Sequence, residues 1–334
     1  MMHKNLLVYL FSLLVLFTVA CKEKQSTEVK KESSVSDTKG LPELISIKQE
    51  NLFPEGVSYD SSANRFFITS LHKGVITEVK PDGSTKVFVN DEKLISVIGI
   101  KTDIARDRLI VCNSDPGASV KTKQETQKKI AGLGVYQLST GTKISYVDLA
   151  ALNPKDVQFC NDMVIDDKGN IYVSNSFAPV IYKVNLEYKP EILLRNEKFS
   201  GEGFNLNGLV YHNNGYIIIA KYNEGSLFKI PVDKPDTFTE VKLPQKLIGA
   251  DGLLWMEEGK LLVIANSGTN KVFLLSSTDD WTSAKIEKEM ATADVFPTTA
   301  TRAGKEYFYL SAKLDKLFSG KLPVAEFEIN KIKF

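Results

Sequence analysis

Residues 160–174 read CNDMVIDDKGNIYVS, and this stretch holds the unit from which most of the chain is built. It begins with a short polar pair, Asn161-Asp162, which runs directly into an apolar segment. A turn signal at 167–170 then leads into a second segment rich in β-branched and aromatic residues. Two such segments joined by a glycine-containing turn are typical of a β-hairpin. The stretch therefore predicts two neighbouring antiparallel strands, with the polar pair at the start of the first.

The same arrangement recurs six times along the chain. In each repeat the second strand is a nearly continuous apolar run, as expected for a strand that is buried on both faces. Equivalent positions are 43, 63, 46, 44 and 46 residues apart, and a repeat of about this length is typical of a four-stranded propeller blade. We therefore predict an all-β fold, a six-bladed β-propeller. The positions used are Gly56, Gly99, Asp162, Gly208, Gly252 and Thr298.

Two irregularities interrupt the repeat. The sixth repeat lacks a fourth strand, and the strand-like residues 44–48 have no partner, so we predict that this N-terminal strand closes the last blade. The longest interval contains an insert at 113–133, between the second and third strands of the second blade. That connection is expected on the same face as the polar turns. It is therefore either a substrate lid over the channel or a solvated surface loop.

The first forty residues do not belong to the repeat. Residues 1–20 contain an apolar run that is shorter than the roughly 20 residues needed to span a bilayer, which predicts a signal peptide. Its end resembles a bacterial lipoprotein cleavage box and implies a lipid anchor at Cys21; an ordinary secretory peptide is the alternative. Residues 21–40 are polar and lack aromatic residues, as expected for a flexible tether, and 41–334 remain for the propeller. We expect an exported protein, lipid-anchored to the bacterial membrane, because the residues after Cys21 resemble those of outer-membrane lipoproteins.

Charge and cysteine content restrict the partners. The chain has 42 Lys and Arg residues against 41 Asp and Glu, so no basic surface for nucleic acid is predicted. No heptad pattern or exposed edge strand favours assembly, and we expect a monomer. Cys112 and Cys160 lie in or beside apolar segments of neighbouring repeats. Two buried free thiols are favoured, although an exported protein could also form a disulfide.

Four of the six polar turns carry an oxygen-bearing side chain at the same phase: Glu55, Asn161, Asn207 and Asp251. Residues at one phase of a rotational repeat converge on its axis. Carboxylate and amide oxygens without His or Cys favour Ca²⁺, with Mg²⁺ or Mn²⁺ as alternatives. The pattern therefore predicts a metal site in the central channel. Ordinary turns and a structural calcium ion without catalysis are the other interpretations.

These turns, each followed by an apolar strand, resemble those of the senescence marker protein (regucalcin)/gluconolactonase family, with the paraoxonases as more distant relatives. Residues 166–173 and 297–300 are also similar to that family, so the resemblance covers about residues 50–330. It implies a six-bladed propeller with a catalytic divalent cation in its channel that hydrolyses lactones and related esters.

The resemblance also implies roles for individual residues. Glu55, Asn207 and Asp251 would bind the metal. Asn161 would be a further ligand or a substrate contact. Asp251 would in addition orient or deprotonate the water that attacks the carbonyl carbon, while the cation stabilises the developing oxyanion.

Further candidates are predicted at the mouth of the channel, where the second strands end. Lys221 and Lys313 would receive a carboxylate or sugar acid, Asn113 would contact the substrate, and His72 would take part in proton transfer. Solvated side chains at the rim are the alternative. Three functions remain open at this stage. They are a metal-dependent lactonase or esterase, a non-catalytic membrane-tethered binding propeller with a structural calcium ion, and a strictosidine-synthase-like reaction on the same scaffold.

Overall fold

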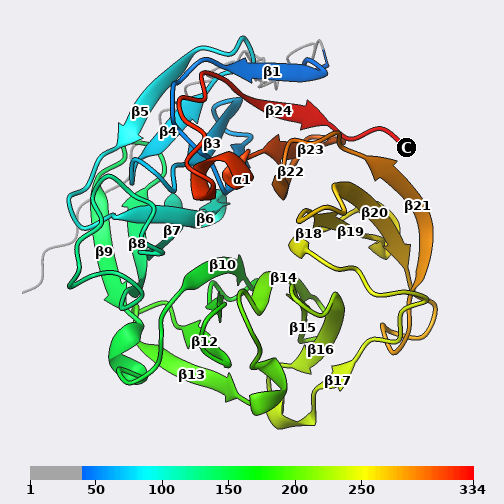
Figure 1. Ribbon diagram of the computed structural model, residues 1–334. Helices are drawn as coiled ribbons and strands as arrows, with labels where there is room; N and C mark the ends of the chain where they lie inside the picture. Colours follow the sequence, from blue (N-terminus) through cyan, green and yellow to red (C-terminus); the bar gives the residue numbers. More distant parts are fainter. Residues whose placement is uncertain (1–39) are drawn as a thin grey trace, which may run out of the picture. The chain divides into compact units, whose positions relative to one another are not determined.

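The computed structural model describes residues 40–334, and residues 41–334 form one compact unit. Its strands are arranged as six blades around a central axis (Figure 1). The predicted signal peptide, the lipidation site Cys21 and all but the last residue of the predicted tether lie outside the described residues. Within 40–334, no helix is both long enough and apolar enough to cross a bilayer.

Every blade is a four-stranded antiparallel sheet, and the first five blades follow the order of the chain. Blade one consists of β2 (Val57–Asp60), β3 (Arg65–Thr69), β4 (Ile76–Val79) and β5 (Thr85–Val89). Blade two consists of β6 (Ser96–Asp103), β7 (Arg108–Ser114), β8 (Ala131–Gln137) and β9 (Lys143–Asp148). Blade three consists of β10 (Cys160–Ile165), β11 (Ile171–Asn175), β12 (Val180–Val184) and β13 (Pro190–Arg195).

The second half of the ring repeats this order. Blade four consists of β14 (Leu206–His212), β15 (Tyr216–Lys221), β16 (Ser226–Pro231) and β17 (Thr239–Glu240). Blade five consists of β18 (Ala250–Trp255), β19 (Leu261–Ala265), β20 (Lys271–Ser276) and β21 (Lys285–Ala291). Blade six contains β22 (Pro297–Ala303), β23 (Glu306–Ser311) and β24 (Phe327–Lys331), with β1 (Leu44–Ile47) as its fourth strand. The helical turns between strands are η1 (Ile104–Arg106), η2 (Ala150–Leu152), η3 (Glu197–Phe199), η4 (Pro235–Thr237), η5 (Glu257–Gly259) and α1 (Leu314–Phe318).

The N-terminal strand closes the last blade, which confirms the prediction. β1 pairs antiparallel with β24, and Leu44 lies opposite Asn330. Ile45 and Ile47 of β1 are buried in the core. Because β1 covers the outer edge of β24, residues from both ends of the described chain belong to one sheet.

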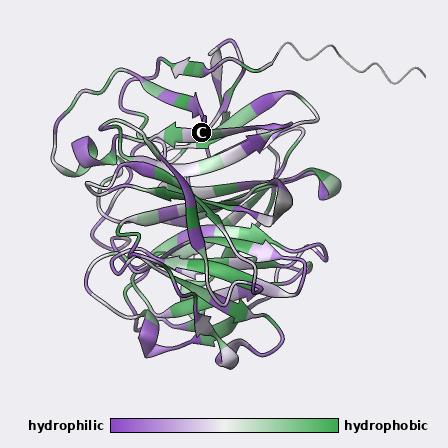
Figure 2. Ribbon diagram, turned by 90° about the vertical axis from the view of Figure 1, so that its right-hand side faces the viewer, coloured by the Kyte–Doolittle hydropathy of each residue, from purple (hydrophilic) through white to green (hydrophobic). Residues whose placement is uncertain are grey.

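Apolar side chains from neighbouring blades fill the space between the sheets. Hydrophobic segments lie along the packed strands (Figure 2). The rings of Phe66 and Phe308, 5.6 Å apart, join blades one and six, while Tyr172 and Tyr211 stack at 6.0 Å between blades three and four. Full burial of such a side chain contributes roughly 1.5–3 kcal/mol. This packing fixes the six inner strands around the axis.

Five of the six inner strands, those of blades two to six, carry the same irregularity where they approach the axis. In β10, Cys160 pairs with Asn175 and Met163 pairs with Val173, so one extra residue is accommodated on the inner strand. Such a β-bulge redirects side chains at a sheet edge. The other shifts lie between Val97 and Ile100, Leu206 and Leu209, Ala250 and Leu253, and Pro297 and Ala300.

In blade one the equivalent residues stand just before the inner strand, and in blade six they are threonines. In blade one, Glu55-Gly56 precede β2, and the backbone amides of both residues donate to Thr69 Oγ1 at 3.3 and 2.8 Å. In blade six the register makes Thr299 the equivalent of Asp162, so the choice of Thr298 as the repeat marker was one residue out. Each bulge thus has a first position, such as Asn161, and a second position, such as Asp162.

Glycine recurs at the second position because neighbouring inner strands approach each other closely there. A Cβ atom at Gly208 would lie 2.1 Å from the Asp251 carbonyl oxygen, and one at Gly56 would lie 2.6 Å from the Ile98 carbonyl oxygen. Only glycine allows backbones to pass at such distances. In blades one, two, four and five, where it is glycine, the second position is therefore set by packing, which leaves the first position available for chemistry.

The two cysteines of the described residues are buried free thiols, as favoured from the sequence. Burial raises the pKa of Cys112, and a hydrogen bond with Cys160 raises it further. A protonated, inert thiol is therefore expected at Cys112.

Candidate functional site

The structure brings four predicted residues together around one cavity in the channel. Glu55, Asn161, Asn207 and Asp251 line it, and their exposed fractions are 6, 3, 3 and 6%. Asn161, Asn207 and Asp251 hold the first bulge position of blades three, four and five, and Glu55 holds the equivalent position just before β2 of blade one. The cavity has a volume of about 50 Å³, which is enough for a cation and one or two water molecules.

Three oxygens of this group are buried without a hydrogen-bond partner among the described residues. They are Glu55 Oε2, Asn161 Oδ1 and Asn207 Oδ1. A buried polar atom without a partner is costly and rare. Three acceptors in one cavity, with no donor facing them, form the kind of site that a cation occupies.

Neighbouring side chains fix the orientation of these groups. Asn161 Nδ2 donates to Ser176 Oγ at 2.7 Å, and that hydroxyl donates to the Leu206 carbonyl oxygen at 2.5 Å. Asn266 Nδ2 donates to Asp251 Oδ2 at 2.6 Å. These supports hold the Asn161 oxygen and the Asp251 carboxylate in place before any ligand arrives, which favours binding.

The negative charges of the carboxylates in and beside the cavity repel one another. Burial raises the pKa of Glu55 well above its usual value, and the charges of Asp251 and Asp162 raise it further. Burial is also the main cause that raises the pKa of Asp251. Lys101 Nζ lies 3.4 Å from Asp162 Oδ1 and offsets one charge. If all three carboxyls are ionised, two negative charges remain, which a divalent cation would balance.

The donor set fits a hard cation that uses amide oxygens and water. No group of three or more His, Cys, Asp or Glu side chains able to hold a metal occurs within residues 40–334. A site based on histidine or thiolate, as zinc prefers, is therefore not formed by this part of the chain. Two carboxylates and two amides supply fewer than the six to eight oxygens that Ca²⁺ takes, so water or substrate would complete the shell.

The structure does not bring Asn113 and Lys221 to the cavity. Asn113 is fully buried; its Oδ1 accepts from the Ile95 amide at 2.8 Å, and its Nδ2 donates to the Lys93 carbonyl oxygen. Lys221 is 1% exposed and donates to two backbone carbonyl oxygens, and to Glu224 Oε1 at 2.7 Å. Both side chains support the loops at the ends of the second strands.

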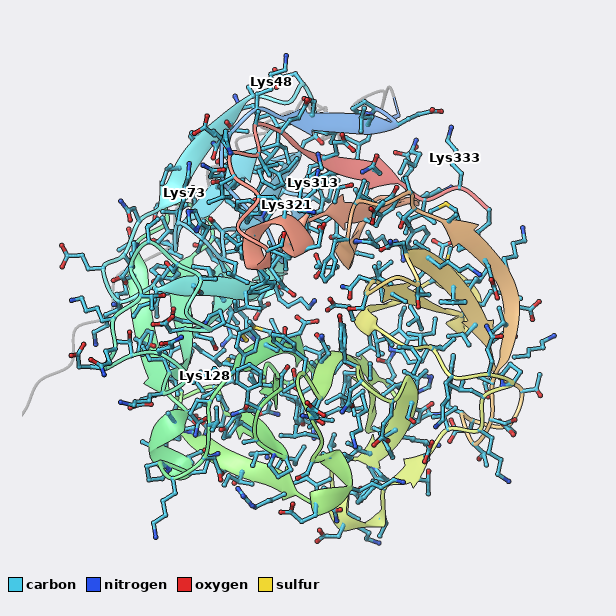
Figure 3. All side chains as sticks on the ribbon, viewed as in Figure 1. Lys48, Lys73, Lys128, Lys313, Lys321 and Lys333 are labelled. Carbon is cyan, nitrogen blue, oxygen red and sulfur yellow. The ribbon has the colours of Figure 1, made fainter. Side chains whose placement is uncertain are left out.

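His72 and Lys313 also lie outside the cavity lining. His72 Nδ1 lies 2.8 Å from the Ala118 carbonyl oxygen, and the His72 carbonyl oxygen accepts from the Val120 amide at 2.9 Å. Lys313, labelled beside α1 in Figure 3, donates to the Glu326 carbonyl oxygen at 2.8 Å. Neither side chain belongs to the lining that surrounds the four oxygen-bearing residues.

The insert of blade two is anchored to blade one. It occupies residues 115–130, between β7 and β8. The Asp115 carboxylate holds its turns together through Thr122 and Thr126, and Lys121 Nζ donates to the Gly74 and Leu94 carbonyl oxygens. No residue of this segment lines the cavity. The structure thus favours the surface-loop interpretation over the substrate lid.

The cavity also has an apolar part that was not predicted from the sequence. Six apolar or aromatic side chains, which we call the apolar wall, line the cavity beside the four oxygen-bearing residues. Two of them come from α1, which lies near the channel in Figure 1. The wall consists of Leu71, Phe159, Phe204, Phe296, Leu314 and Phe318.

A signal for part of this wall was present in the repeat. Phe159 and Phe296 stand two residues before the first bulge position of their blades, and Phe204 stands three residues before it. The rings of Phe159 and Phe204 are in edge contact at 5.2 Å. A recurrent phenylalanine before an oxygen-bearing residue would have predicted apolar side chains next to the oxygen-bearing ones in the cavity.

Neither a protein-family model nor a curated protein matches this sequence. Solved structures that resemble it include the major allergen Mala s 1 of Malassezia sympodialis, with 18% identity, a TM-score of 0.71, and coverage of 88% of this chain and 97% of that one. A calcium-binding protein, regucalcin, from Agrobacterium tumefaciens has 14% identity and a TM-score of 0.61, covering 86% and 92%. Virginiamycin B lyase from Staphylococcus aureus has 14% identity and a TM-score of 0.56, covering 80% of each chain. At identities this low, the likeness shows the β-propeller fold alone.

Proposed function

We propose that this protein is a divalent-metal-dependent hydrolase of lactones or related esters, with the cation held in the central channel. The observation that carries the proposal is the set of unpaired buried oxygens of Glu55, Asn161 and Asn207 in the cavity that Asp251 also lines. Oxygen ligands of this kind suit Ca²⁺ first, and Mg²⁺ or Mn²⁺ second. The structural likeness to a calcium-binding regucalcin supports this choice.

Hydrolysis adds water across the acyl C–O bond, so that the hydroxyl goes to the acyl carbon and a proton to the departing oxygen. When bound, the cation would polarise the carbonyl group as a Lewis acid. Glu55, Asn161 and Asn207 would hold it. Asp251, fixed by Asn266, would orient the attacking water. Burial raises the pKa of Asp251 and a bound cation opposes that rise, so orientation rather than full deprotonation is the expected role.

The test combines activity with a single substitution. The protein is incubated with Ca²⁺, Mg²⁺ or Mn²⁺ and with EDTA, and lactone hydrolysis is followed by acid release. We expect one cation to be required, and Asp251→Asn to lower kcat by about 100-fold or more. Glu125→Gln, which removes an exposed carboxylate of the insert, is the control. Full turnover of Asp251→Asn would eliminate the role of that residue.

A non-catalytic binding propeller with a structural calcium ion is the second candidate. It is favoured by the position of His72 and His212, the two histidines of the described residues, neither of which lines the cavity. No imidazole is therefore available there as a general base. Stabilisation by a cation without turnover of any lactone or ester would favour this function.

We also propose that the propeller is exported as a monomer and lipid-anchored to the bacterial membrane through Cys21, with the outer membrane favoured. The support is the sequence of residues 1–40. Metabolic labelling with a palmitate analogue should mark the native chain and not Cys21→Ser. Light scattering of the detergent-free Cys21→Ser protein should give the mass of one chain; a larger mass would contradict the monomer.

A further inference from the structure

We infer that the substrate of this site carries an apolar acyl chain or ring, rather than the hydroxyls of a sugar lactone. This inference rests on the proposed function, because it names what the same cavity admits next to the cation. Its basis is the apolar wall, of which Leu71, Phe159 and Leu314 are almost fully buried. The four oxygen-bearing residues form the polar part of the cavity, and the wall forms the remainder together with Ile98 and Tyr222.

The side chains that would recognise sugar hydroxyls are engaged elsewhere. Lys221, Lys313 and Asn113 donate to backbone carbonyl oxygens outside the cavity. Tyr222 does line the cavity, but its hydroxyl donates to Asn266 Oδ1 at 2.5 Å. Among the described residues, the cavity-lining side chains other than those of the four oxygen-bearing residues therefore present no unpaired hydrogen-bond donor or acceptor.

The free energy of transfer from water to this wall differs between a sugar hydroxyl and a methylene group. A sugar hydroxyl that enters such a wall loses its hydrogen bonds to water and finds no replacement. A methylene group gains instead, and each one that is buried should raise the affinity about fourfold. The four oxygen-bearing residues and the apolar wall together match a molecule with one ester group at the end of an apolar body.

Entry of such a molecule requires more space than the cavity offers, since its volume is about 50 Å³. The α1 segment can provide it. Leu314 and Phe318 are four residues apart on one helical turn, and Phe318 is 50% exposed. A helix of five residues is too short to be stable by itself. An acyl chain can therefore displace these two side chains and be covered by them.

The test is a chain-length series measured with the cation that supports activity. The values of kcat/KM are compared for γ-butyrolactone, γ-octalactone, γ-dodecalactone and glucono-δ-lactone. We expect kcat/KM to rise with alkyl length, by about fourfold per methylene until the wall is covered. Phe318→Ser should flatten this rise, because it removes part of the wall that the alkyl chain covers. Phe334→Ser is the matched control, because Phe334 is 41% exposed and does not line the cavity.

Failure of this inference is distinguishable from failure of the proposed function. Faster turnover of glucono-δ-lactone than of γ-dodecalactone, with no effect of alkyl length, would overturn the inference and leave the hydrolase in place. If no lactone is hydrolysed with any cation, the proposed function fails and binding of a dansyl-labelled fatty acid is measured instead. Saturable binding that is weakened by Phe318→Ser, but not by Phe334→Ser, would support the apolar ligand class. Absence of binding would overturn it as well.

Discussion

Blades five and two have the same backbone at the axis and different side chains on it. Both inner strands carry the bulge, and a Cβ atom at either second-position glycine, Gly252 or Gly99, would lie 2.6 Å from a neighbouring carbonyl oxygen. At the first position blade five has the carboxylate of Asp251, whereas blade two has the apolar Ile98, and both line the cavity. In these two blades, therefore, the second position serves the packing of the ring, and the first position faces the cavity.

The largest expected effect comes from the second position. Gly252→Ala and Gly99→Ala should each destabilise the protein by about 3 kcal/mol, because the added methyl group meets backbone that cannot move aside. Urea unfolding in EDTA measures this loss. Gly215→Ala, at a turn with φ of 82° and open space around it, should cost only about 1 kcal/mol. Similar losses at all three glycines would break the comparison.

The first position should instead control the response to a cation. At 100 times its dissociation constant, a cation that binds only the folded state adds about 2.7 kcal/mol to the free energy of unfolding. Glu55→Gln should remove most of this gain in Ca²⁺. Ile98→Val, a change at the equivalent position of blade two, should keep it. If Glu55→Gln keeps the stabilisation by Ca²⁺, the cation does not bind at Glu55 and the proposed site on the axis is wrong.

The third prediction concerns pH. Burial raises the pKa of Glu55 and Asp251 in the folded protein. Their contribution to stability is therefore present below the unfolded pKa values, near about 4, and is lost as pH rises through the higher folded values. In EDTA the free energy of unfolding should fall above about pH 4, by at most about 1.4 kcal/mol per pH unit for each carboxyl.

Two comparisons sharpen the pH experiment. Saturating Ca²⁺ should reduce the fall, because a cation favours the ionised carboxylates, and Glu55→Gln should remove part of it in EDTA. Exposed carboxyls act in the opposite direction and at lower pH; hydrogen bonds from Ser283 lower the pKa of Asp279 to about 2. Urea unfolding from pH 4 to 8 would contradict the interpretation if stability in EDTA rose across that range.

The smallest effect is expected in blade six, where the first position closes the ring. Thr298 Oγ1 and Thr299 Oγ1 both donate to the Glu55 carbonyl oxygen, at 2.6 and 2.9 Å. Thr298→Val should cost about 1 kcal/mol, the usual contribution of one hydrogen bond. The double variant with Thr299→Val should cost more than the sum of the singles, since it leaves a buried carbonyl oxygen unpaired. Strict additivity would argue against shared support of Glu55.

The parts of the molecule that depend on local pattern were predictable from the sequence. The six repeats, the closing strand at residues 44–48 and the convergence of Glu55, Asn161, Asn207 and Asp251 follow from periodicity. Rotational symmetry converts equal phase into equal position. The repeat therefore carried three-dimensional information that a single motif would lack.

The parts that depend on long-range contacts were not predictable in this way. Lys221 stands at a strand end, as expected, but its ammonium group bonds to carbonyl oxygens of Lys198 and Ser200. Which carbonyls come within reach is decided by how the loop of a neighbouring blade folds. The same holds for Leu314 and Phe318, because a single helical turn between β23 and β24 leaves almost no periodic signal.

The pairing of β1 with β24 has a consequence for biosynthesis. During synthesis β1 stays unpaired until residues 327–331 have been made, because β24 is the one strand with which it pairs in its sheet. Contacts across so much chain form slowly, and an apolar strand that waits is a ready partner for another copy. Slow translation or delayed release of the C-terminal segment should therefore reduce the yield of native protein through aggregation, even though the finished ring leaves the inner face of that strand buried.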